Sequence, residues 1–225
     1  MRGDRNSRNK IVTTKPNLSI LHQYIQSIGN KLIEVDLVLK SDLKDIDVLC
    51  FTEHWLKEDY LKLININQYE LASYFSRKQY THGGSYIYVG KNICTKNLHC
   101  FQNIGAEDSE VSATELVDYD YIIVCIYRSA DGNFQILLKI LEFILHTIQS
   151  RNKKPLLCGD WNLNFLVDNK RLRELQILLV SYNMMNTVRS PTRITPTTVP
   201  LIDVIIINKD SPILRETFYP PYYLV

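Results

Sequence analysis

The sequence lacks the features that mark a membrane protein, a secreted disulfide-bonded protein or a zinc-binding module. No apolar run approaches the roughly 18 residues that are needed to span a bilayer, and no segment has the pattern of a signal peptide. The 5 cysteines form no Cys-x-x-Cys pair and no zinc-ligand spacing. An odd cysteine count without a signal peptide favours a reducing compartment. We therefore expect an intracellular protein, cytoplasmic or nuclear, that does not bind a membrane.

Strong charge, internal repeats and low-complexity linkers are also absent. The net charge of +2 is too small to indicate nucleic-acid binding by itself. Basic residues do crowd residues 1–16, where a solvated tail and an arm that touches phosphate are both compatible with the pattern. With 45% hydrophobic and 22% charged residues, the chain has the composition of a globular protein. We expect a basic flexible tail over 1–16, one domain over 17–210 and a divergent end over 211–225.

Hydrophobic periodicity predicts a mixture of strands and helices. A wide apolar stripe with helical spacing predicts a helix over 134–149, and weaker helical patterns cover 28–39 and 171–182. Short apolar or alternating runs predict strands at 18–22, 47–51, 69–75, 85–89, 121–127, 155–158 and 201–207. This mixture excludes a helical bundle and disfavours a sandwich without helices. The residues alone therefore indicate an α/β or α+β domain.

Four of the predicted strands end in a polar side chain beside a turn. These side chains belong to the segments Phe51-Thr-Glu-His54, Ile126-Tyr-Arg128, Cys158-Gly-Asp-Trp-Asn162 and Leu201-Ile-Asp203. Strand ends on one rim of a rigid sheet can hold separate catalytic groups together, and carboxylates there offer oxygen ligands to Mg²⁺. Each segment has a plainer interpretation as well: a glutamate after a strand can be a solvated turn residue, and Asp160 with Asn162 can form an Asx-turn.

The ordered set of motifs resembles the endonuclease domains of non-LTR (LINE-like) retrotransposon reverse transcriptases. These belong to the endonuclease/exonuclease/phosphatase superfamily, with the apurinic/apyrimidinic endonucleases and DNase I. The resemblance covers about residues 17–208. The motifs are Leu18-Ser-Ile-Leu-His-Gln-Tyr-Ile-Gln-Ser-Ile28, Thr52-Glu-His-Trp-Leu56, His82-Gly-Gly84, Val124-Cys-Ile-Tyr-Arg-Ser129, Leu157-Cys-Gly-Asp-Trp-Asn162, Pro191-Thr-Arg-Ile-Thr195 and Leu201-Ile-Asp203.

The resemblance implies a fold and a role for each matching position. The fold would be a four-layered α-β-β-α sandwich of two mixed sheets with outer helices. Glu53 would bind Mg²⁺ or Mn²⁺, and Tyr127 would hydrogen-bond the scissile phosphate. Asp160 would orient or deprotonate the attacking water, Asn162 would position it, and Asp203 would orient a histidine. A phosphodiester must be neutralised and attacked in line by a positioned water, so these roles are chemically coherent.

The resemblance also implies partners. Arg128 and Arg193 are candidates for contact with nucleic acid, although an arginine beside a turn can equally be an ordinary surface residue. The expected substrate is DNA, nicked to leave a 3′ hydroxyl, and a reverse-transcriptase domain is expected in the full-length element.

The chain departs from the family pattern at two places. Tyr24 stands where the first strand of the family usually ends in asparagine, and no histidine follows His146, although the family ends in a Ser-Asp-His motif. His54 and His82 lie in segments that have other roles in the family, so neither is expected to replace that histidine. We expect impaired catalysis and an incomplete set of C-terminal strands that leaves an unpaired sheet edge. The alternatives are an inactive nucleic-acid-binding remnant and a phosphatase of the same superfamily.

Overall fold

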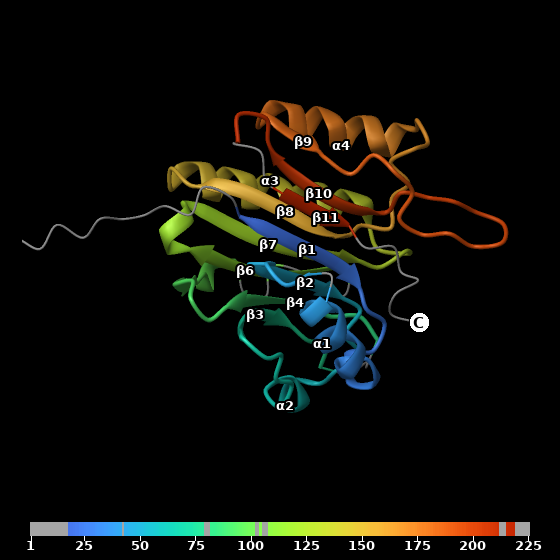
Figure 1. Cartoon of the computed structure of the whole chain (residues 1–225). Coiled ribbons are helices and arrows are strands. Elements are labelled where there is room, and N and C mark those ends of the chain that lie inside the picture. The colour runs from blue at the N-terminus through green and yellow to red at the C-terminus, as the bar shows by residue number, and fades with distance from the viewer. Residues whose placement is uncertain are drawn as a thin grey trace, which may run out of the picture.

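The computed structural model describes residues 18–41, 43–78, 82–101, 104, 108–211 and 215–218. Two β-sheets pack face to face, with helices on their outer sides (Figure 1). This is the four-layered sandwich that the sequence led us to expect. The basic tail expected over 1–16 lies outside the described residues.

The first sheet has five strands in the order β11-β1-β2-β4-β3. Strands β11, β1 and β2 run parallel to one another, whereas β4 pairs antiparallel with both β2 and β3. The strands are β1 (Ser19–Tyr24), β2 (Val48–Thr52), β3 (Tyr69–Phe75), β4 (Ser85–Gly90) and β11 (Arg215–Phe218).

The second sheet has six strands in the order β5-β6-β7-β8-β10-β9. Only β7 and β8 are parallel, and the other pairs are antiparallel. The strands are β5 (Thr95–Asn97), β6 (Ser109–Leu116), β7 (Tyr121–Arg128), β8 (Lys154–Asp160), β9 (Met184–Asn186) and β10 (Asp203–Asn208). Both sheets are therefore mixed, as expected.

Helices cover the outer face of each sheet, with α3 and α4 beside the six-stranded sheet and α1 and α2 on the side of the other (Figure 1). The helices are α1 (Leu32–Ser41), α2 (Glu58–Leu61), α3 (Phe134–Ser150) and α4 (Lys170–Ser181), with 3₁₀ turns η1 (Ile28–Asn30), η2 (His99–Phe101) and η3 (Val117–Tyr119). The side chains of Asn133 and Asn169 cap α3 and α4 by accepting backbone N–H groups of their first turns. Across the described residues, every helix is too short or too polar to cross a bilayer.

The end of the chain differs from the expectation in one respect. We expected the divergent segment 211–225 to leave a sheet edge without its strand, but residues 215–218 form β11 and pair with β1 over Ser19 to His22. This pairing gives hydrogen-bond partners to backbone groups of β1 that would otherwise form the edge. In the described residues, β11 is itself the outermost strand on that side.

Candidate active site

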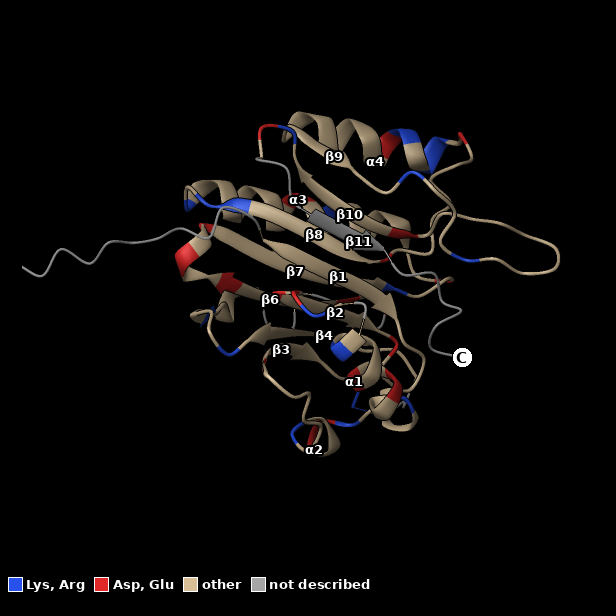
Figure 2. Cartoon of the chain, in the orientation of Figure 1, with Lys and Arg blue, Asp and Glu red and all other residues tan. Residues whose placement is uncertain are grey.

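The predicted functional residues converge at one rim of the two sheets. The carboxyl ends of β7 and β8 lie there together with the beginning of β10, because β8 is parallel to β7 and antiparallel to β10. The carboxyl end of β2 lies there too, since Glu53, which follows β2, is hydrogen-bonded to Tyr127 of β7. In that last pairing Asp203 is the direct cross-strand partner of Asp160. Figure 2 shows that the strands are largely uncharged along their lengths and that most charged residues lie on helices, loops and strand ends. The charged residues of this rim therefore lie at the ends of strands that are otherwise largely uncharged.

Asp160 is the most deeply placed member of the site, with an exposed fraction of 1%. Its Oδ1 accepts the backbone N–H of Asn162 at 3.0 Å, and its Oδ2 has no hydrogen-bond partner among the described residues. Burial, with the nearby Asp203 carboxylate as the next cause, raises the pKa of Asp160 well above its usual value. A buried carboxylate with a free oxygen and a raised pKa is suited to hold or accept a proton at the rim.

Asn162 turns the chain directly after β8. Its φ of 46° lies in the left-handed region, which asparagine tolerates better than most residues. Its side-chain amide donates to the carbonyl of Arg128 at 2.8 Å, which ties the turn to the end of β7. The Asx-turn interpretation is thus correct for Asp160 and Asn162, and the turn is also what brings both side chains to the rim.

Glu53 is held in a strained backbone conformation with a φ of 62°. Its N–H donates to the carbonyl of Gly84 at 2.9 Å, and its carboxylate accepts the indole N–H of Trp55. Gly84 has a φ of +96° and lies so close to His54 that a Cβ there would be 2.0 Å from Nε2 of that ring. The Gly83-Gly84 turn is therefore required for the close approach that positions Glu53.

Tyr127 and Glu110 lie beside Glu53 at the rim. Burial and a hydrogen bond to Glu53 raise the pKa of the Tyr127 hydroxyl well above its usual value. Glu110 is the cross-strand partner of Tyr127, and its fully buried carboxylate accepts the Gly84 N–H and the guanidinium of Arg77. Burial raises the pKa of Glu110 to about 7. Glu110 could not be predicted as a site residue from the sequence, because β6 has no apolar run that would mark it as a strand.

Asp203 does have a histidine neighbour, although none follows it in the sequence. His22 Nδ1 lies 3.6 Å from Asp203 Oδ1, and its Nε2 lies 3.4 Å from Thr52 Oγ1. Burial raises the pKa of Asp203, while His22 and a hydrogen bond with Thr192 act in the opposite direction. His22 is itself fully buried, on β1 of the other sheet. It supports Asp203 from inside the core and has no access to a substrate at the surface.

Tyr24 and Arg193 stack on each other at the open side of the site. The Arg193 guanidinium carbon lies 4.5 Å from the centre of the Tyr24 ring. Burial and the Glu53 carboxylate raise the pKa of the Tyr24 hydroxyl, and Arg193 opposes them through its charge and a hydrogen bond. The charge of Arg193 also partly opposes the rise in the pKa of the buried Asp160. Arg193 therefore lies at the candidate site. From the sequence alone, an ordinary surface arginine was an equally good interpretation of this residue.

Arg128 does not fit the expected contact with nucleic acid. It is 2% exposed, and its guanidinium donates to the backbone carbonyls of Trp161 at 3.2 Å and Gly132 at 2.5 Å. Further, longer bonds reach Ala130 and Asn162. Arg128 follows Tyr127 at the end of β7 but points to the opposite face, as alternate strand residues do. Arg128 therefore links the loop that follows β7 to the turn that follows β8.

The two other histidines near the rim do not supply a free imidazole close to Asp203. His54 is buried, with Nε2 2.8 Å from the carbonyl of Phe75 and Nδ1 accepting the Leu56 N–H at 3.0 Å. Burial lowers the pKa of His54 to about 4. The ring of His82 packs edge-on against Trp55 at the surface. Both placements agree with the expectation that neither replaces the family's C-terminal histidine.

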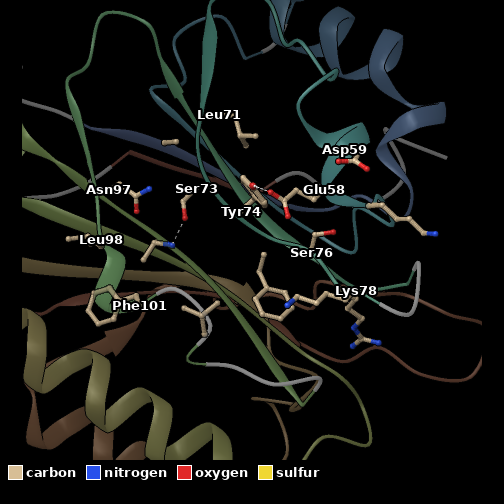
Figure 3. Close-up of a pocket in the computed structure, with 16 residues that line it drawn as sticks. Glu58, Asp59, Leu71, Ser73, Tyr74, Ser76, Lys78, Asn97, Leu98 and Phe101 are labelled. Atoms are coloured by element: carbon tan, nitrogen blue, oxygen red, sulfur yellow. Dashed lines mark hydrogen bonds between the residues drawn. The ribbon is translucent and has the colours of Figure 1, made fainter.

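A cavity of about 690 Å³ lies apart from these residues, along β3 and β6 (Figure 3). Its wall combines apolar side chains such as Leu71 and Phe101 with polar ones such as Ser73 and Asn97. Arg77 belongs both to this wall and to the ion pair with Glu110. The cavity and the site are thus linked through that pair.

The residues of the rim fit a divalent cation. Glu53, Glu110 and Asp160 are close enough that the charge of Glu53 contributes to the raised pKa of both of the others. Carboxylates that repel one another in this way are stabilised by a bound cation, and oxygen ligands are those that Mg²⁺ and Mn²⁺ take. Glu53 is the partly exposed member of the three.

Comparison with solved structures confirms the fold. The endonuclease domain of TRAS1, a telomere-specific non-LTR retrotransposon, superposes with a TM-score of 0.63 and 13% identity over 85% of this chain and 84% of that chain. An AP endonuclease from Archaeoglobus fulgidus gives a TM-score of 0.58 and 16% identity, covering 84% of this chain and 86% of its own. No protein-family model matches the sequence, and neither does any curated protein.

The same fold is found in a mannosyl-6-phosphatase from Bacteroides thetaiotaomicron, with a TM-score of 0.58, 8% identity and 85% of both chains covered. The chain therefore has the fold of the endonuclease/exonuclease/phosphatase proteins, as its motifs implied. Proteins of this fold act on different substrates, so the substrate must be argued from the site.

Proposed function

We propose that this chain is a metal-dependent phosphodiester hydrolase that nicks DNA to leave a 3′ hydroxyl, and that it is a weak catalyst. The observation that carries the proposal is the buried Asp160 carboxylate, whose free oxygen lies at a rim shared with Tyr127, Asn162 and Glu53. The retrotransposon endonuclease domain and the AP endonuclease of the same fold favour DNA as the substrate.

Each residue of the rim has a role in this proposal. Asp160 accepts a proton from the attacking water through the oxygen of its carboxylate that has no partner among the described residues. The side chain of Asn162 orients that water. The Tyr127 hydroxyl stays protonated and donates to a non-bridging phosphate oxygen, because its pKa lies well above its usual value. Asp203 and His22 hold the Asp160 strand pair in place from inside the core.

Mg²⁺ or Mn²⁺ would be held by Glu53, with Glu110 and Asp160 adding negative charge nearby. When bound there, the cation would neutralise charge on the phosphate. DNA is the expected partner, with Arg193 as the contact to its backbone, and a reverse-transcriptase domain would belong to the full-length element.

Weak catalysis follows from two features of the site. The Tyr24 ring and the Arg193 guanidinium are stacked where an asparagine would leave room for a phosphate. The one histidine beside Asp203 among the described residues is His22, which is fully buried and does not reach the reacting phosphate. A missing acid–base or phosphate-contacting group lowers the rate by a factor on the order of 10²–10⁴.

A second candidate function is DNA binding without cleavage. The stacked Tyr24 and Arg193 pair favours it, because an aromatic ring and a guanidinium are what single-stranded nucleic acid stacks on. The two functions differ in what Asp160→Ala does: cleavage requires the carboxylate, whereas binding does not.

A plasmid assay separates these functions. Supercoiled DNA is incubated with excess protein, with Mg²⁺ or with a chelator, and nicked product is extended by a polymerase to show a 3′ hydroxyl. We expect slow nicking that requires Mg²⁺, is lost in Asp160→Ala and is kept in the matched surface variant Asp168→Ala. Equal nicking by the parent and Asp160→Ala would refute the proposal. DNA retention in a gel without nicking, lost in Arg193→Ala, would establish the second function instead.

A further inference from the structure

Three of the five cysteines meet at one point in the core between the sheets. The sulfur atoms of Cys50, Cys125 and Cys158 lie within 4.8 Å of one another, and all three side chains are fully buried. Cys50 lies on β2 of the five-stranded sheet, and the other two lie on β7 and β8 of the six-stranded sheet. The cluster therefore bridges the two layers of the sandwich.

Strand register, rather than loop geometry, fixes these positions. Cys125 and Cys158 are direct cross-strand partners in the parallel pair of β7 and β8. The Cys125 thiol also contacts the Phe51 carbonyl at 3.8 Å, next to Cys50 on the opposite sheet. A site built on paired strands is held more rigidly than one built on loops.

The spacing of the sulfur atoms suits a shared ligand. A metal–sulfur bond of about 2.3 Å places sulfur ligands of one ion about 4 Å apart. The observed limit of 4.8 Å leaves less than about 1 Å to be closed, which small side-chain rotations accomplish. Thiolates select soft cations such as Zn²⁺ and Cu⁺ and do not suit Mg²⁺, so this cluster is chemically distinct from the carboxylate rim.

We propose that Cys50, Cys125 and Cys158 bind one thiophilic cation, Zn²⁺ or Cu⁺, that joins the two sheets. Each thiol that becomes a ligand releases its proton to solvent, and no redox change is involved. Cu⁺ is satisfied by the three sulfurs, whereas Zn²⁺ takes four ligands. The three sulfurs are the ligands that the cluster itself offers, so it fits Cu⁺ more directly than Zn²⁺. Because the cluster is closed to solvent, the ion enters while the chain folds.

The competing explanation is that the thiols are small apolar side chains in an ordinary core. The two explanations differ in measurable ways. A packing role requires no metal and tolerates alanine at a modest loss of stability. A metal site retains an ion through desalting, and loses it when one ligand is replaced.

The test refolds the full chain under reducing conditions with Zn²⁺, with Cu⁺ or with neither, and measures retained metal by mass spectrometry after desalting. We expect about one equivalent of Zn²⁺ or Cu⁺ and a higher unfolding temperature than for the metal-free sample. Cys125→Ala and Cys158→Ala should lose the metal. The control Cys94→Ser with Cys100→Ser, which alters the exposed cysteines, should keep it, as should Glu53→Gln.

X-ray absorption on the metal-loaded parent provides a measurement that does not depend on folded variants. A first shell of three sulfurs supports the proposal. The proposal is overturned if no metal is retained, if the shell contains only nitrogen and oxygen, or if folded Cys125→Ala binds as much metal as the parent. This result is independent of nicking activity, so it neither supports nor weakens the proposed function.

Discussion

Glu110 gives the prediction that can be worked out furthest from the structure. Its carboxylate is fully buried beside Arg77 and Gly84, and burial raises its pKa from 4.5 to about 7. Below pH 4.5 the group is protonated in both the folded and the unfolded chain. Between pH 4.5 and about 7 only the folded chain keeps the proton, so stability from this group falls as the pH rises.

The size of this effect follows from the pKa difference. Each pKa unit is worth about 1.4 kcal/mol, so the rise to about 7 corresponds to a loss of about 3 kcal/mol between the two values. Glu110→Gln cannot titrate. The free energy of unfolding of the variant minus that of the parent should therefore increase by about 3 kcal/mol over this range and stay level above it. The attraction of Arg77 for the ionised carboxylate is already contained in the pKa of about 7, so it adds nothing further to this slope.

Urea unfolding followed by circular dichroism at several pH values between 4 and 8 measures that difference. Glu70→Gln, which makes the same change at an exposed position of β3, is the matched control. A difference curve for Glu110→Gln that is flat, or that falls as the pH rises, would show that Glu110 is ionised in the folded protein throughout and that the reasoning is wrong.

Three further predictions concern residues that hold the site. Arg128→Met should destabilise the fold by about 3–5 kcal/mol in urea unfolding, because it leaves several carbonyls unpaired; equal stability of Arg128→Met and the surface variant Arg173→Met would contradict this. Gly84→Ala should cost about 1–3 kcal/mol or more through its positive φ and its contact with His54, while Gly29→Ala, where a Cβ meets only an ordinary contact, should be tolerated. Glu53→Gln should weaken Mg²⁺ binding in titration calorimetry and Glu58→Gln should not, so that unchanged binding by Glu53→Gln would place the metal elsewhere.

The sequence predicted those helices and strands whose own residues show a clear apolar pattern. The apolar stripe of α3 records burial on one face, and the continuous apolar runs of β7, β8 and β10 record burial on both faces. Strand β6 was not predicted, because five of its eight residues are polar although all eight are buried. Strand β11 was not predicted either, since its pairing with β1 joins residues almost 200 positions apart.

The candidate site was predicted where function lies at strand ends and missed where it depends on contacts across the sandwich. Asp160 is the last residue of β8 and Asn162 follows that strand closely, so their place could be inferred. The contact between His22 and Asp203 joins the first and last thirds of the chain and has no local signal. Arg128 was expected to face substrate, but the alternation of β7 turns it toward the interior carbonyls. Neither the His22–Asp203 contact nor the inward direction of Arg128 can be predicted from the spacing of residues in the sequence.

The most direct test of the account restores the groups that this site lacks. Tyr24→Asn is combined with an added C-terminal segment that carries Ser-Asp-His, and Mg²⁺-dependent nicking of supercoiled plasmid is measured for the parent, the repaired chain and the repaired chain with Asp160→Ala. We expect the repair to raise nicking by at least about two orders of magnitude, and Asp160→Ala to abolish the gain. Robust nicking by the unmodified chain that is lost on Asp160→Ala would contradict the account, because another group would then supply the missing role.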